Sequence, residues 1–231
     1  MSAPAATTDP VAAHVAELDR VLRGATKDRR SIVREVREGL QDAAEAYRHA
    51  GMDPREAARR AVREFGPVAD VAPLYQDELA ADQGRRTALL LAAGLPALSM
   101  GWDLLWRVGI DWGPERPNLA LVKALASVQD TASVAVAATA LLLVALTFRR
   151  TRSPRGVAAA AAASALAAVV VCGGAAVGMS VANGADTLRM VGSQAVGALA
   201  YLVSLTMLVL INRSALRTLR TLRGPRRPRP G

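Results

Sequence analysis

Four long apolar stretches constrain the fold of this chain more than any other feature. They occupy residues 87–106, 124–148, 156–182 and 190–211 of the 231-residue sequence. A helix needs roughly 20 apolar residues to cross the hydrocarbon core of a bilayer, and each stretch is long enough. A buried helical hairpin of a soluble protein is the alternative, but four such stretches in succession argue against it. The sequence therefore predicts a four-helix transmembrane domain over residues 84–211.

Composition favours helices throughout. The chain is 52% hydrophobic but only 3% aromatic, so Ala, Val and Leu supply most of the apolar residues. These residues suit helices and lipid better than the core of a sheet protein. The third stretch is rich in Ala and depends on Val169-Val170-Val171-Cys172 for membrane insertion, which makes it the weakest of the four. We predict an all-α fold, with a small N-terminal bundle of three to four helices ahead of the membrane helices.

The net charge of +9 is unevenly distributed along the sequence. Residues 1–86 hold 14 basic and 15 acidic side chains, whereas the remainder holds 15 basic and 5 acidic ones. The composition changes at Gly84-Arg85-Arg86, which we interpret as the boundary between an N-terminal domain, residues 10–83, and the membrane domain. Residues 1–9 are small and polar, so we expect them to be disordered and not to act as a signal peptide.

Basic residues predict the orientation in the membrane. Thirteen of them flank one side of the four spans and four flank the other. Because cytoplasmic flanks are rich in Lys and Arg, both termini are expected in the cytoplasm of a multi-pass protein of the inner or plasma membrane. Three Trp residues and three acids then fall near the outer ends of the spans: Trp102, Trp106, Trp112, Asp103, Asp130 and Asp186. An interfacial position accounts for them; a Trp cage for a ligand and a transport role for the acids are the alternatives.

The basic tail, residues 212–231, continues the last span. Its first four arginines recur at helical spacing, namely Arg213, Arg217, Arg220 and Arg223. Anionic headgroups attract such cations, so we predict that this stripe contacts lipid of the inner leaflet, and that the Pro-rich end after Gly224 is disordered. Nucleic-acid binding is the alternative, but topology is enough to explain the arginines. Two pairs of small residues, Gly174 with Gly178 and Ser193 with Gly197, suggest close helix packing within the bundle or in a homo-oligomer.

Residues 10–83 show the periodicity of a small helical domain. A first helix begins at Pro10 after the N-cap Asp9, and a second runs from Thr26 to a stop at Gly51. Their apolar stripes are Val11, Val15, Leu18 and Leu22 in the first helix, and Ile32, Val33, Val36, Leu40, Ala43, Ala44 and Tyr47 in the second.

A third helix opens at Pro54 with Asp53 as N-cap and Glu56 in a capping box, and it ends at Gly66-Pro67. Its apolar face is Ala58, Ala61, Val62 and Phe65, and a last helix leads to the membrane with Val68, Val71, Ala72, Leu74, Tyr75 and Leu79.

The third helix also carries a strip of four arginines: Arg55, Arg59, Arg60 and Arg63. A solvated face with ion pairs to Glu56 and Glu64 is one explanation, and a binding strip for a partner is the other. Direct reading of DNA is not favoured, because the N-terminal segment is not net basic and no helix-turn-helix pattern is evident.

The segment Gly51-Met52-Asp53-Pro54-Arg55-Glu56-Ala57-Ala58-Arg59-Arg60-Ala61-Val62-Arg63-Glu64-Phe65-Gly66-Pro67, behind an Arg- and Glu-rich second helix, resembles the permease prefix domain and the related HAAS signalling domain. The resemblance covers about residues 10–80. It implies a cytoplasmic domain ahead of membrane helices that takes part in protein–protein signalling, in a family often encoded beside a PadR-type transcription regulator. It brings no catalytic residues.

These observations together predict a membrane signalling or regulatory adaptor. Its cytoplasmic domain would dock a PadR-type regulator or a transporter, and an accessory subunit of a transporter or permease complex is the alternative. We expect no enzyme activity, metal or cofactor, because His14 and His49 lack ligand spacing, the lone Cys172 falls inside a span, and no Gly-rich phosphate loop occurs.

Overall fold

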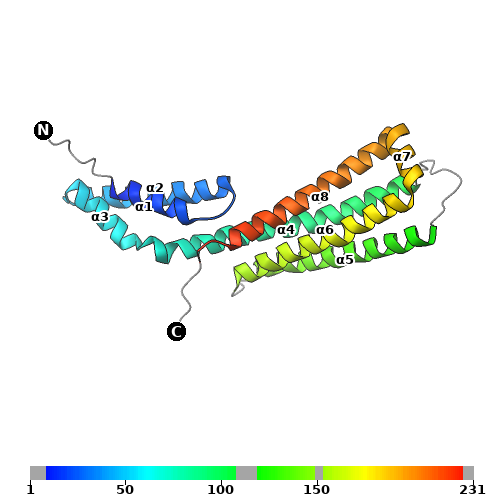
Figure 1. Ribbon diagram of the computed structural model, residues 1–231. Coiled ribbons are helices and arrows are strands. Elements are labelled where there is room, and N and C mark those ends of the chain that lie inside the picture. Colours follow the sequence, from blue (N-terminus) through cyan, green and yellow to red (C-terminus); the bar gives the residue numbers. More distant parts are fainter. Residues whose placement is uncertain (1–8, 108–118, 149–152, 226–231) are drawn as a thin grey trace. The chain divides into compact units, whose positions relative to one another are not determined.

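A computed structural model describes residues 9–107, 119–148 and 153–225. The regular structure of these ranges is entirely helical, which confirms the predicted all-α fold. The helices are α1 Pro10–Val21, α2 Thr26–His49, α3 Pro54–Phe65, α4 Val68–Arg107, α5 Leu119–Phe148, α6 Pro154–Ala182, α7 Gly184–Ser193 and α8 Ala195–Leu222 (Figure 1). Some sequence predictions fall on residues outside the described ranges. These are the disorder of residues 1–8 and 226–231, the position of Trp112, and the side chains of Trp106 and Asp186.

The chain divides into two units. The N-terminal unit consists of residues 1–80 together with 220–231, and the membrane unit consists of residues 81–219. The division falls within α4 and again within α8, so two helices each contribute to both units. The predicted last helix of the N-terminal domain and the predicted first span are one continuous helix, Val68–Arg107, which Pro96 in its interior does not interrupt.

In the N-terminal unit, caps and glycines set the ends of the helices. The Asp9 carboxylate accepts a hydrogen bond from the Val11 amide at 3.1 Å, and Asp53 accepts one from the Arg55 amide at 2.9 Å. A proline follows each cap, where its missing N–H costs nothing. Gly51 and Gly66 have φ of 91° and 97°, a backbone region that favours glycine, and they follow α2 and α3 as predicted.

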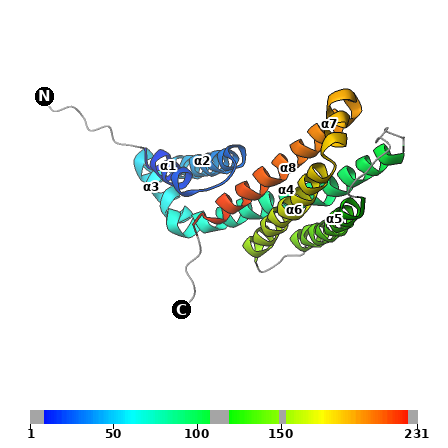
Figure 2. The ribbon, with the colours of Figure 1, turned by 45° about the vertical axis from the view of Figure 1, so that its right-hand side comes forward.

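The core of this unit contains the predicted stripes of α1 and α2, packed against α3 and the first turns of α4. Figures 1 and 2 show α1 lying along α2. Two details of the core differ from prediction. Ala57 of α3 is fully buried although the predicted face omitted it, and Leu74 of α4 is 48% exposed although the predicted stripe included it. The stripe of α4 instead includes Gln76, which is fully buried.

Gln76 connects three segments of the N-terminal unit through its amide group. Its Oε1 accepts a hydrogen bond from the Arg23 amide at 2.9 Å, and its Nε2 donates to the Arg23 carbonyl and to the Thr221 carbonyl, both at 2.7 Å. The α1–α2 connection, α4 and the end of α8 are thereby joined. A buried amide is tolerated because its donor and acceptor groups are satisfied here.

In the membrane unit, four helices are long and apolar enough to cross a bilayer. Their apolar windows lie in Val68–Leu105, Ala120–Thr147, Pro154–Ala182 and Ala195–Leu222, with mean hydropathy between 1.6 and 2.1. The Ala-rich third candidate has the highest value, although the sequence suggested it was the weakest. The fourth begins at Ala195 and not at Met190, because the backbone of Gln194 (φ −122°, ψ 109°) leaves the helix between α7 and α8.

The apolar surface of these helices is largely uncovered by protein. No more than 22% of each apolar window is buried, and large side chains such as Val170 and Val181 are 72% and 75% exposed. Continuous apolar surface of this extent is not found on soluble monomers. The chain is therefore an α-helical, multi-pass membrane protein.

Small residues allow the membrane helices to approach one another closely. One face of α6 is buried through alanines alone: Ala158, Ala161, Ala162, Ala165, Ala168 and Ala175. Figures 1 and 2 show α5 and α6 side by side, and the core of the unit also includes α4 and α8. Of the predicted glycine pair, Gly178 lies against Leu125 of α5 but Gly174 faces open space. Ser193 ends α7 and Gly197 lies on α8, so the second predicted pair is not on one continuous helix.

Hydroxyl groups satisfy one another where α4 meets α8 inside the membrane unit. Thr87 Oγ1 lies 2.7 Å from Ser214 Oγ and 2.9 Å from Thr218 Oγ1, and both threonines are fully buried. Trp102 donates its indole N–H to Ser204 Oγ at 3.0 Å, so a protein group satisfies this donor. Because Thr87 and Thr218 are buried, their mutual hydrogen bonds offset the cost of removing these hydroxyls from water and favour the association of α4 with α8.

Gly84, which the sequence suggested as a domain boundary, is a packing residue. A Cβ added there would lie 2.7 Å from Cα and 2.8 Å from Cβ of Ala158 on α6. We expect Gly84→Ala to lower the unfolding free energy of the membrane unit by about 1–3 kcal/mol through overpacking. Titration of the purified chain with dodecyl sulfate, followed by Trp fluorescence, measures this change because all three Trp lie beyond residue 81.

Gly101→Ala is the matched control for this prediction. Gly101 lies on the same helix α4 with nothing within 4 Å of its added Cβ. The unfolding midpoint of Gly101→Ala should match that of the parent chain. Equal losses of unfolding free energy in Gly84→Ala and Gly101→Ala would contradict close α4–α6 packing at Gly84.

Replacing Gln76 by Leu should destabilise the N-terminal unit by about 1–3 kcal/mol, because the buried Thr221 carbonyl and the partly buried amide and carbonyl of Arg23 lose their partner. Hydrogen exchange of the full chain should show faster exchange at the Arg23 amide. Gln41→Leu changes an exposed glutamine of α2 and should leave that amide unaffected. If the Arg23 amide exchanged at the same rate in Gln76→Leu as in the parent chain, the Gln76 side chain would not hold the α1–α2 connection.

Candidate docking surface on the N-terminal helical unit

Helix α3 presents an arginine face opposite its buried face. Ala57 and Ala61 are buried at 0% and 3% exposure, and they point into the core of the N-terminal unit. At about 100° of rotation per residue, Arg55, Arg59 and Arg63 fall on the side of the helix opposite these alanines. All three are exposed. The face defined by Arg55, Arg59 and Arg63, here called the arginine face, is thus presented to solvent.

Arg60, the fourth arginine of the predicted strip, is used inside the unit. Its Nε donates to Glu64 Oε1 at 3.0 Å, and its guanidinium carbon lies 4.7 Å from the ring centroid of Tyr47 on α2. The Tyr47 hydroxyl donates to the other oxygen of Glu64. These contacts join α3 to α2, so Arg60 does not belong to the arginine face.

The hydrogen bonds within the trio of Tyr47, Arg60 and Glu64 stabilise the ionised form of Glu64 and the protonated form of Tyr47. Hydrogen bonds from Tyr47 and Arg60 lower the pKa of Glu64 below its usual range. The hydrogen bond to the Glu64 carboxylate raises the pKa of Tyr47, because it stabilises the protonated hydroxyl. At neutral pH the trio therefore holds one anion, one cation and one neutral phenol.

Arg59 and Arg63 make no ion pair with any residue that the structure describes, although the sequence allowed pairs with Glu56 and Glu64. Glu64 is instead held by Arg60 and Tyr47. Sequence spacing did not indicate the role of Tyr47, because its partners are on another helix and it also fits the apolar stripe of α2. Arg59 and Arg63 thus retain positive charge that no ion pair among the described residues neutralises.

Several residues of segment 51–67 have structural roles in the N-terminal unit. Gly51 and Gly66 supply positive φ, Pro54 starts α3, and Ala57 and Ala61 are buried. Phe65 packs edge-to-face on His14 of α1, with ring centroids 5.6 Å apart. The residues of the arginine face lie at the intervening positions. The glycines, Pro54 and the two buried alanines therefore shape and seat α3, and the exposed arginines between them form its surface.

The four tail arginines do not stay together. Arg213 and Arg217 belong to the membrane unit and are exposed, whereas Arg220 and Arg223 belong to the N-terminal unit. The opposite side of α8 is buried through Ile211, Ala215 and Thr218. Arg213, Arg217 and Arg220 lie on α8, which ends at Leu222 before Arg223. Contact of these arginines with lipid stays a prediction.

The remaining predicted positions show no assembled site. Asp103 and Asp130 are exposed on α4 and α5, and Cys172 Sγ lies 3.7 Å from Ser133 Oγ inside the membrane unit. Within residues 9–107, 119–148 and 153–225, no group of three His, Cys, Asp or Glu side chains could hold a metal ion.

The fold and this surface define a multi-pass helical membrane protein with an N-terminal helical unit. Comparisons of the chain with protein-family models, with curated proteins and with solved structures find no match.

His14 makes the stability of the N-terminal unit depend on pH. The side chain is 8% exposed, and burial lowers its pKa below the ordinary value of 6.5, an effect that Glu17 opposes. Because the unfolded chain takes up the proton first, stability should be full above pH 6.5 and should fall as the pH drops below it. Hydrogen exchange of α1 and α3 amides, corrected for intrinsic rates, measures this slope.

His14→Gln should abolish this pH dependence, and His49→Gln, at the exposed last residue of α2, should retain it. The slope is the readout, so a uniform loss of stability in His14→Gln does not affect the comparison. An identical slope in all three proteins would contradict the assignment to His14.

Proposed function

We propose that this chain is a membrane-anchored adaptor whose N-terminal helical unit docks an acidic surface of a cytoplasmic partner protein. The observation that carries the proposal is the arginine face of α3, which points away from the core while Arg60 is engaged internally. Arginine suits such contacts because its planar guanidinium binds carboxylates through two parallel hydrogen bonds.

The partner is a PadR-type transcription regulator or a transporter, which is what the resemblance to the permease prefix and HAAS domains implies. The excess of basic flanks supports a cytoplasmic N-terminal unit, where both kinds of partner would be accessible. Nothing in this role requires catalysis.

The connection to the membrane would be made by α4. This helix contributes Val68, Ala72 and Leu79 to the core of the N-terminal unit, and Ala88, Leu91 and Leu95 to that of the membrane unit. A change in the packing of the membrane helices would alter the α4 side chains that support α3. Docking would then be stronger in one arrangement of the bundle than in the other.

Photo-crosslinking in the native host tests the docking role. A photoreactive residue at position 55, on the arginine face, should crosslink the full chain to one protein species. Arg59→Glu combined with Arg63→Glu should abolish the crosslink and weaken binding of the purified partner at least about tenfold, since each lost charge-assisted hydrogen bond has a cost of that order. Hydrogen exchange of α3 checks that the helix is retained.

Arg30→Glu combined with Arg37→Glu is the matched control, because it makes the same change of charge at exposed residues of α2. It should preserve the crosslink. Failure to recover a protein from position 55, or equal losses in both double variants, would reject the docking role.

A further inference from the structure

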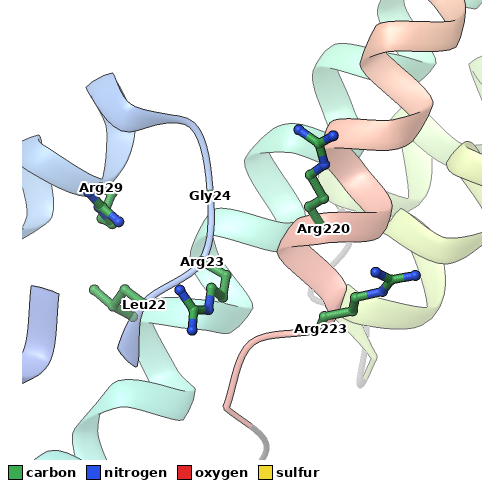
Figure 3. Close-up of a pocket in the computed structure, with 6 residues that line it drawn as sticks. All are labelled: Leu22, Arg23, Gly24, Arg29, Arg220 and Arg223. Atoms are coloured by element: carbon green, nitrogen blue, oxygen red, sulfur yellow. The ribbon is translucent and has the colours of Figure 1, made fainter. Parts of the chain in front are cut away.

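Four arginines from opposite ends of the sequence line one cavity of the N-terminal unit. The cavity has a volume of about 340 Å³ and is lined by Leu22, Arg23, Gly24, Arg29, Arg220 and Arg223. Figure 3 shows Arg23 on the α1–α2 connection, Arg29 on α2, and Arg220 and Arg223 at the end of α8. Four of the six lining residues are cationic and none is acidic.

The backbone that carries these arginines is held in place by Gln76. Its side chain binds both the amide and the carbonyl of Arg23, and it also binds the carbonyl of Thr221, which lies between Arg220 and Arg223 in sequence. The backbone of Gly224 passes so close to Gln76 that an added Cβ would overlap the Gln76 side chain. The juxtaposition of the two ends of the chain is thus built from buried contacts.

Local pairing neutralises little of this charge. Arg29 forms an ion pair with Asp19 at 3.0 Å, with 30% of its side chain exposed, whereas Arg23, Arg220 and Arg223 are exposed. Figure 3 shows the guanidinium groups pointing in different directions. A multivalent anion in the cavity would offset the repulsion between them and let the long side chains converge.

Topology does not explain this arrangement. An excess of cytoplasmic arginine accounts for basic residues in the tail. It does not account for the placement of Arg220 and Arg223 beside Arg23 and Arg29, which come from the other end of the chain.

We propose that this cavity binds a phosphate group carrying at least two negative charges. Guanidinium groups match phosphate oxygens through paired hydrogen bonds. The cavity is at the small end of the range of roughly 300–1,000 Å³ for ligand pockets, which fits a pyrophosphate-sized compound or a phosphomonoester headgroup. The site lies apart from the arginine face of α3 and does not depend on the docking role.

The test uses the full chain in nanodiscs and phosphate-free buffer. Pyrophosphate is titrated onto the chain in phosphatidylcholine nanodiscs by calorimetry, and hydrogen exchange is followed around Arg23 and Thr221. A second arm replaces part of the lipid by phosphatidic acid, with no pyrophosphate. A soluble ligand predicts binding and protection in the first arm, and a lipid headgroup predicts protection in the second arm alone.

Arg23→Gln combined with Arg223→Gln should weaken the binding at least about tenfold, or abolish protection in the arm that shows it, because charge-assisted hydrogen bonds are lost. Arg20→Gln combined with Arg37→Gln removes the same charge from exposed residues outside the cavity and should change binding by less than about twofold. Absence of binding and protection in both arms, or equal losses in the two double variants, would overturn the proposal.

Discussion

Lipid-facing apolar side chains are the constraint on which the membrane unit depends. Because no more than 22% of each apolar window is buried, the helices must be surrounded by hydrocarbon, where backbone and side-chain polar groups find no water. The alanine face of α6 and Gly84 bring backbones close together, and the hydroxyls of Thr87, Ser214 and Thr218 satisfy one another. Packing and polar pairing replace the hydrophobic effect that would drive such helices together in water.

The N-terminal unit depends on the hydrophobic effect, but one polar side chain decides how its segments meet. Its core is built from the apolar stripes of α1 to α4, and Gln76 then fixes the α1–α2 connection against the end of α8. A buried amide is specific because it accepts few arrangements without leaving a donor or acceptor unsatisfied. The same contacts that satisfy Gln76 bring Arg220 and Arg223 to Arg23.

The two charged features of this unit have different origins. The arginine face follows from helix periodicity, since Arg55, Arg59 and Arg63 must lie opposite Ala57 and Ala61 once α3 forms. The arginine cavity follows from tertiary contacts, because its members come from two helices and a connection far apart in sequence. Helix α4 contributes side chains to the cores of both units.

Local sequence determined the all-α class, the four apolar spans, the caps at Asp9 and Asp53, and the stops at Gly51 and Gly66, because length, periodicity and backbone preference act over a few residues. The sequence also predicted the arginines of α3 and α8. It did not predict the contact of Arg60 with Tyr47, because Tyr47 lies on another helix, α2. Only the tertiary structure decided that α4 continues unbroken, that Gly84 packs on Ala158, and that Gln76 joins Arg23 to Thr221. Those contacts link residues separated by 53 to 145 positions, and their pairing depends on the path of the whole chain, which no local pattern encodes.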